Sequence, residues 1–300
     1  MRLRYLHLDV FTGVPFAGNQ LAVFPEPGEL TAPDMQAIAK EMAFSESTFV
    51  FPPTGRGDVR MRIFTPGSEL PMAGHPTIGS TFALALEGVI AAGRPEFVFE
   101  LGVGPTRVSL EWRDEALAFA WMTQPSPQFG AIVADRAALA QALGVEDAHL
   151  ARELPAQVVS SGVPFLFVPL ASRAAVDAAA IDRRALQRML ASAGEPERPV
   201  FLFTLDGSRE GETVYSRMLG PVLGVPEDPA TGGASGPLGA YLVQYALVPP
   251  ERALDIVSLQ GVAMGRPSRI HVAIDGRPGH ITRVRVGGQS VLVGRGEILR

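Results

Sequence analysis

The chain has 300 residues, of which 47% are apolar and 19% are charged, and its formal net charge at pH 7 is -5. This length and apolar content predict about two domains with large cores, and the negative charge argues against binding to nucleic acid or an anionic membrane. The chain has no cysteine, which excludes disulfides, thiolate metal sites and cysteine catalysis.

The N-terminus lacks the apolar core of a signal peptide, and no apolar stretch reaches the roughly 18 residues of a membrane span. We therefore expect a cytoplasmic protein with no membrane association. Lys40 is the only lysine, and no glycine precedes it, which excludes a P-loop and argues against a pyridoxal Schiff base. The five histidines show no metal-ligand spacing. The sequence thus predicts neither a metal nor an organic cofactor.

The order of structural signals in the first half returns in the second. An apolar strand is predicted up to Phe24, followed by a helix capped by Thr31 and a strand over 47–51. In the second half, a strand over 163–170 precedes a helix that follows Asp182 and a strand over 200–205. Strand–helix patterns of this kind also recur by chance, so this order alone does not establish a duplication.

A sharper match follows in both halves. Arg62-Ile63-Phe64-Thr65-Pro66 resembles Arg217-Met218-Leu219-Gly220-Pro221, and each leads to Glu-x-Pro-x-x-Gly, at 69–74 and 227–232. Helices predicted over 77–87 and 235–248 come next, and both are apolar on nearly all sides, as buried helices are. The sequence therefore favours a duplicated fold, with a first half over 1–124 and a second half over 125–287, joined at a proline-rich segment.

Small residues cluster where the two buried helices begin. The first cluster includes Gly74 and Thr77, and the second includes Thr231, Gly232 and Gly233. A helix N-terminus presents unpaired N–H groups and a partial positive charge, and glycine allows a ligand to approach the backbone closely. These turns are candidate binding sites for a substrate carboxylate. The alternative is that the glycines serve only tight packing.

Three titratable residues are candidates for acid–base chemistry. His75 lies at the mouth of the first buried helix, and Asp228 directly precedes the second turn, where an aspartate also serves as a helix cap. Glu46 lies between serines, in a short polar segment before an apolar strand. Partial burial would raise its pKa toward the working pH of a general base, although a solvated loop residue is an equal alternative.

These residues lie within motifs that together resemble the phenazine-biosynthesis PhzF-like family. The motifs run through nearly the whole chain: Asp9-Val10-Phe11-Thr12, Pro15-Phe16-Ala17-Gly18-Asn19, Ser45-Glu46-Ser47-Thr48-Phe49, Arg62-Ile63-Phe64-Thr65-Pro66, Ala73-Gly74-His75-Pro76-Thr77-Ile78-Gly79, Glu227-Asp228-Pro229-Ala230-Thr231-Gly232 and Gln260-Gly261-Val262-Ala263-Met264-Gly265-Arg266-Pro267-Ser268.

The resemblance implies a diaminopimelate-epimerase-like α+β fold. It has two pseudo-symmetric halves, each a strongly curved, mostly antiparallel sheet around a central buried helix, with the site between them. It also implies that the C-terminal segment 288–300 returns to the first half and that the protein is a homodimer.

The resemblance further assigns roles to the candidate residues. A glutamate matching Glu46 shuttles the proton, and residues matching Gly74, His75 and Asp228 line the site. The type reaction moves a ring proton of a dihydro-hydroxyanthranilate without metal or organic cofactor. The chain departs from the family pattern at Gly233, where the family usually has a serine.

We therefore expect an isomerase that moves a proton on a small, carboxylate-bearing and cyclic metabolite. A hydrolase or lyase that uses the same carboxylates is an alternative, as is a non-catalytic protein that binds a small acid.

Overall fold

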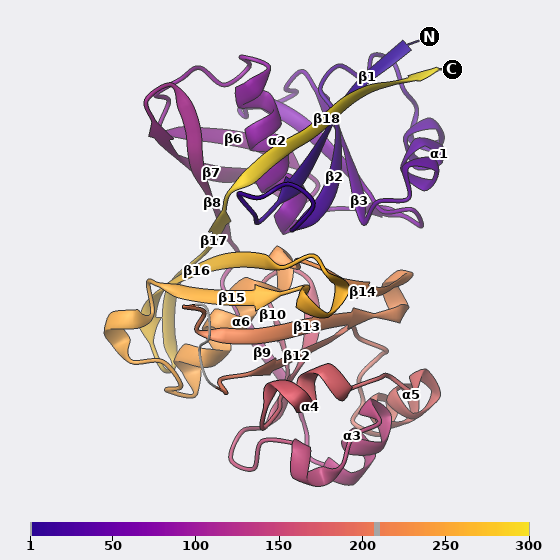
Figure 1. The fold of residues 1–300 in the computed structure, drawn as a ribbon, viewed down its shortest axis with the longest axis vertical. Coiled ribbons are helices and arrows are strands. Elements are labelled where there is room, and N and C mark those ends of the chain that lie inside the picture. The colour runs from indigo at the N-terminus through magenta and orange to yellow at the C-terminus, as the bar shows by residue number, and fades with distance from the viewer. Residues whose placement is uncertain (1, 207–210, 300) are drawn as a thin grey trace. The chain divides into compact units, whose positions relative to one another are not determined.

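The computed structural model describes residues 2–206 and 211–299 and contains two compact units (Figure 1). The first unit runs to Gln124 and resumes at Arg285, and the second comprises Pro125–Val284. Each unit combines a sheet with helices, which confirms the expected α+β class. Among the described residues, no helix is long and apolar enough to span a membrane.

The first unit is built from strands around one long helix, with a second helix outside. Its elements are β1 (Arg2–Val10), β2 (Asn19–Phe24), α1 (Ala32–Met42), β3 (Glu46–Phe51), β4 (Val59–Phe64), β5 (Glu69–Leu70), α2 (Gly74–Leu86), β6 (Glu96–Leu101), β7 (Gly104–Arg113), β8 (Ala116–Gln124) and β18 (Ser290–Leu299). The last strand pairs antiparallel with β1, so the two ends of the chain lie side by side in this unit (Figure 1).

The second unit holds the remaining elements. They are β9 (Gln128–Val133), α3 (Arg136–Leu143), β10 (Ala156–Ser160), β11 (Pro164–Pro169), α4 (Arg173–Ala178), α5 (Arg183–Ser192), β12 (Val200–Thr204), β13 (Val214–Gly220), β14 (Val225–Asp228), α6 (Gly232–Gln244), β15 (Ile256–Gln260), β16 (Ser268–Arg277) and β17 (His280–Gly288), of which the last crosses the boundary at Arg285.

Seven strands of each unit have the same order and the same directions. In the first unit the order is β18–β1–β2–β3–β4–β6–β7, with only β2/β3 and β4/β6 parallel. In the second it is β9–β10–β11–β12–β13–β15–β16, with only β11/β12 and β13/β15 parallel. The two halves indicated by the sequence therefore have the same strand topology, and the strands of both are mostly antiparallel.

A buried helix occupies the core of each unit. Every residue of α2 from Gly74 to Leu84 is buried, and α6 is buried over nearly the same length. A Cβ added at Gly79 would lie 2.5 Å from a Leu21 methyl carbon and 2.6 Å from one of Val10, so glycine is what permits this close approach of α2 to the sheet.

Both central helices begin three residues earlier than the sequence pattern predicts, at Gly74 and Gly232 rather than at Thr77 and Ser235. Pro76 is no obstacle, because the N–H groups of the first turn have no acceptor within the helix. The difference matters because it places His75 and Gly233 inside the first turn of their helices.

The outer helices begin where the caps predict. Thr31 and Asp34 form a reciprocal capping box at the start of α1, with a distance of 3.0 Å from Thr31 N to Asp34 Oδ2. Asp182 accepts a hydrogen bond from Ala185 N at 3.0 Å at the start of α5. Each of these helices joins two parallel neighbouring strands and buries one apolar face on the sheet.

A bidentate ion pair braces the turn before each central helix. Arg62 on β4 donates to both carboxylate oxygens of Glu69, at 2.7 and 2.6 Å, and Arg217 on β13 binds Glu227 in the same way, at 2.9 and 2.8 Å. The resembling arginine and glutamate positions of the two halves therefore contact one another in the same manner in both units. This geometry fixes the direction of the carboxylate as well as its distance.

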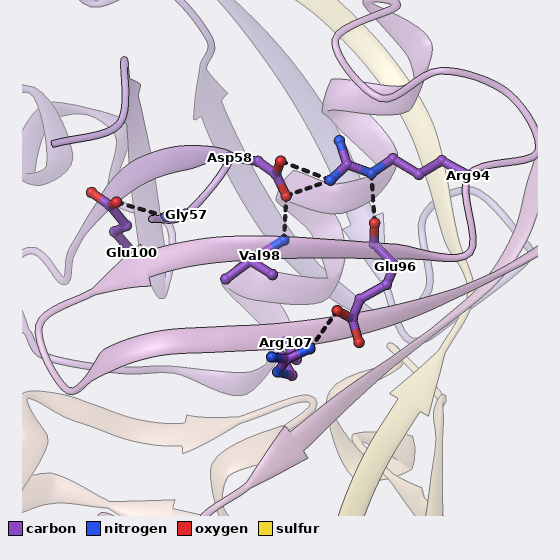
Figure 2. A network of polar contacts seen from close by, with 7 residues as sticks. All are labelled: Gly57, Asp58, Arg94, Glu96, Val98, Glu100 and Arg107. Atoms are coloured by element: carbon purple, nitrogen blue, oxygen red, sulfur yellow. Dashed lines mark hydrogen bonds and ion pairs between the residues drawn. The ribbon is translucent and has the colours of Figure 1, made fainter. Parts of the chain in front are cut away.

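A further polar network lies around β6 (Figure 2). Arg94 binds both carboxylate oxygens of Asp58 at 2.7 Å and the carbonyl oxygen of Glu96 at 2.6 Å. Glu100, farther along the same strand, accepts a hydrogen bond from Gly57 N at 2.9 Å. These contacts tie the loop before β4 to β6, which pairs with β4, and we assign them a structural role.

Candidate active site

The structure brings two of the sequence-predicted catalytic residues together. Glu46 is the first residue of β3, and His75 is the second residue of α2. Glu46 Oε2 lies 3.2 Å from His75 Nε2, and the exposed fractions of the two side chains are 15% and 4%. A carboxylate and an imidazole thus lie close together at the first turn of a buried helix, where both are largely shielded from solvent.

Burial determines the charge of the histidine. Loss of solvent lowers the pKa of His75 to about 3, because a buried imidazole is harder to protonate. The imidazole is therefore neutral at physiological pH. The other ring nitrogen, Nδ1, lies 3.2 Å from Nδ2 of Asn19, which is the first residue of β2 and is buried.

Asp228, the third predicted residue, belongs to a separate group in the second unit. It is the last residue of β14 and is buried, and its Oδ2 accepts a hydrogen bond from Thr231 Oγ1 at 2.6 Å. Gln260, at the end of β15, holds this turn from the other side. Its Nε2 donates to Asp228 O at 2.7 Å and to Thr231 Oγ1 at 3.0 Å, and its Oε1 accepts from Thr231 N at 3.1 Å.

The residue after Gln260 closes the turn. Gly261 has a φ of +77°, and a Cβ there would lie 2.6 Å from Pro229 O and 2.4 Å from Arg266 O. A side chain at this position would collide with two backbone oxygens, so glycine is required. The geometry around Asp228 is therefore built from two segments that are distant in sequence.

The predicted carboxylate-binding turns form the first turns of the two central helices. Neither N-cap residue, Ala73 for α2 or Thr231 for α6, caps its helix with a side chain. The Thr77 hydroxyl donates to Ala73 O at 2.7 Å, and this side chain is fully buried. Gly74 and Gly232 are the first residues of their helices, and the space around a Cβ at Gly233 is open to 4 Å.

The two units share a scaffold but not their polar groups. Ser47 and Val200 hold equivalent places in the sheets, since they pair with Phe64 and Leu219, the third residues of the two resembling segments. Glu46 therefore corresponds to Pro199 in the second unit.

The helices differ in the same way. His75 and Gly233 are the second residues of α2 and α6, so the imidazole of the first unit has no equivalent in the second. Leu70 follows Glu69 in the first unit, and Asp228 follows the equivalent Glu227 in the second. The carboxylate of Asp228 therefore has no equivalent in the first unit. Glu46 and His75 thus lie in the first unit, and Asp228 lies in the second.

Sequence reasoning gave no role to Asn19 or Gln260, although both fall within motifs that carry the family resemblance. One further signal was present, since Asn19 is the only asparagine in the chain. Both residues act through hydrogen bonds to residues 29 or more positions away, which no local pattern reveals. Within the described ranges, no group of three or more metal-ligating side chains occurs.

Comparison with known proteins places the chain in a family. The profile of the family described as "Phenazine biosynthesis-like protein" matches residues 8–296. A trans-2,3-dihydro-3-hydroxyanthranilate isomerase from Pseudomonas fluorescens is 38% identical over 98% of this chain and 99% of its own length.

Solved structures agree with this assignment. A PhzF-family phenazine biosynthesis protein from Bacillus anthracis superposes with a TM-score of 0.88 at 27% identity, and each chain is covered completely. A structure described as a "Predicted Epimerase" from Pseudomonas aeruginosa has a TM-score of 0.82 at 33% identity, with 99% of each chain covered.

A sheet-rich α+β fold with duplicated topology, together with these relatives, defines an enzyme of the isomerase class. The chain belongs to the PhzF family of phenazine biosynthesis-like proteins.

The buried state of His75 predicts its titration. Because burial lowers its pKa to about 3, its imidazole should not titrate between about pH 5 and about pH 8 in NMR spectra of the folded protein. An unfolded histidine has a pKa of about 6.5, so the unfolded state binds more protons below that pH, and His75 should destabilise the fold as the pH falls from about 6.5 toward 3. An inflection of the His75 resonances within that neutral range would contradict this description of the site.

Proposed function

We propose that the protein is a cofactor-independent isomerase that moves a proton on a small, cyclic, carboxylate-bearing metabolite, with Glu46 as the proton carrier. The contact between Glu46 and His75 is the observation that supports this most strongly. A carboxylate with an exposed fraction of 15% retains access to a ligand, while its surroundings exclude most water. Those are the conditions under which a glutamate acts as a general base near neutral pH.

In the proposed reaction, the Glu46 carboxylate removes a proton from one carbon of the substrate, and the electron pair of the broken C–H bond moves into the substrate. The protonated Glu46 then returns a proton to a different carbon, and the carboxylate is regenerated. No atom is gained or lost, so substrate and product have the same mass. One residue thus acts first as base and then as acid.

We propose that His75 and Asp228 orient and polarise the substrate. The Asp228 carboxylate accepts a hydrogen bond from the Thr231 hydroxyl, which Gln260 holds in turn, so the direction of the carboxylate is fixed before any ligand binds. The first turns of α2 and α6, at Gly74 and at Gly232 and Gly233, are the proposed binding elements for the substrate carboxylate. The family resemblance also supports a cytoplasmic homodimer.

The relative from Pseudomonas fluorescens is named for trans-2,3-dihydro-3-hydroxyanthranilate, which makes this compound the first substrate to test. Gly233 argues for a preference that differs from the phenazine precursor. A serine hydroxyl at this position would offer a donor at the start of α6, and glycine removes it. Loss of one such donor costs about 1 kcal/mol, and more if a buried substrate group is left unpaired. We therefore propose another small acid as the preferred substrate.

Replacement of Glu46 tests the proposed proton carrier. Glu46→Gln keeps the size of the side chain and removes its basicity, so kcat should fall by about a hundredfold to ten-thousandfold. The variant should still fold and should bind a carboxylate ligand, as measured by calorimetry. Glu41→Gln is the matched control, because Glu41 is exposed on α1 and should leave turnover unchanged. Near-normal turnover by Glu46→Gln would exclude Glu46 as the base.

Replacement of Gly233 tests the substrate preference. The unmodified chain should turn over trans-2,3-dihydro-3-hydroxyanthranilate poorly, and Gly233→Ser should improve kcat/KM by about fivefold, the equivalent of one restored hydrogen bond. The serine Cβ has room, since no atom beyond its chain neighbours and its own helix backbone lies within 4 Å of its position. Gly294→Ser, a change of equal size into open space on β18, is the control. Efficient turnover by the unmodified chain, with no gain from the serine, would refute this role of Gly233.

A further inference from the structure

Both ring nitrogens of His75 lie close to protein side chains. Nε2 lies 3.2 Å from Glu46 Oε2, and Nδ1 lies 3.2 Å from Asn19 Nδ2. His75 and Asn19 are both almost completely buried, with exposed fractions of 3% and 1% for the whole residues. Besides these two groups, the imidazole has a hydrogen bond to the backbone of Gln20, and little water reaches this place.

The chemistry of the two partners decides where the imidazole proton resides. An amide nitrogen donates hydrogen bonds and cannot accept them, so a contact from Asn19 Nδ2 requires Nδ1 to be the acceptor. A neutral imidazole has one N–H, and the remaining proton must then be on Nε2, which faces Glu46. The opposite tautomer would place two donors against each other at Nδ1 and a lone pair against the carboxylate at Nε2.

The chain around Asn19 is built to hold it in place. Gly18 has a φ of +67°, and a Cβ there would lie 2.4 Å from Val10 O, so β2 begins in close contact with β1. Asn19 pairs with Val10 across these strands. The loop that leads to Gly18 is anchored by the buried Asp9, whose Oδ2 accepts a hydrogen bond from Phe16 N at 2.6 Å. The amide of Asn19 is thus positioned by the backbone as well as by its neighbours.

We propose that Asn19 is a positioning residue that fixes His75 as the Nε2–H tautomer, so that the ring nitrogen 3.2 Å from Glu46 Oε2 carries the proton. This inference rests on the proposed role of Glu46. A neutral donor stabilises the carboxylate without the full charge of an imidazolium, which would hold Glu46 ionised and weaken it as a base. A lone pair in the same place would repel the carboxylate instead.

The tautomer is measured directly by NMR on the full chain labelled with ¹⁵N-histidine, with His75 assigned from the spectrum of His75→Gln. We expect a pyridine-type shift for Nδ1 and a pyrrole-type shift for Nε2. The reverse pattern in the unmodified protein would overturn the proposal, whatever any variant does. This readout does not depend on turnover, so it separates failure of this inference from failure of Glu46 as the base.

Asn19→Asp is the matching variant, since it keeps the shape of the side chain and replaces the donor with an acceptor. It should move the proton to Nδ1 and lower kcat by about a hundredfold or more, because the imidazole then presents a lone pair instead of an N–H to Glu46. KM should change by less than about threefold. An unchanged tautomer or an unchanged kcat in this variant would contradict the proposal. If the variant does not fold, the spectrum of the unmodified chain still decides.

Discussion

The contact between Glu46 and His75 is the constraint on which the rest of the proposed chemistry depends. An ionised carboxylate is costly to bury unless a donor compensates it, and an imidazole loses its charge when it is buried without water. The two groups meet 3.2 Å apart at the first turn of α2. In the tautomer that we propose, an N–H facing Glu46 and the positive end of a helix together give a carboxylate partial compensation. A carboxylate whose charge is only partly compensated can both accept a proton and release it.

The duplicated topology explains how such a place is built. Each unit wraps a sheet around one buried helix, and a bidentate arginine–glutamate pair braces the turn before it. Within this common scaffold, the polar residues differ. The first unit has Glu46 and His75 where the second has Pro199 and Gly233, and the second has Asp228 where the first has Leu70. The repeated fold thus carries different polar groups in its two copies, and we propose that the carboxylate of Glu46 moves the proton.

Much of the fold was predictable from the sequence, because its signals are local. The Thr31 and Asp182 caps and the repeated Glu-x-Pro-x-x-Gly turn each lie within a few residues of the element they define. The central helices were predicted to begin three residues after their actual starts, because a helix that is apolar on all sides has no periodicity to mark its first turn. The sequence also singled out Glu46 and His75, but only the fold shows that they touch. Asn19 and Gln260 were missed because their partners are far away in the chain.

Deuterium incorporation tests the central claim most directly. The unmodified enzyme is incubated in D₂O with trans-2,3-dihydro-3-hydroxyanthranilate, or with a better small-acid substrate once one is found, and the product is analysed by mass spectrometry and NMR. Proton transfer by a single carboxylate predicts a product of the same composition as the substrate, with at most one non-exchangeable deuteron, located at the carbon that receives the proton. A product that has gained or lost water, or deuterium at several carbons, would contradict the proposed reaction.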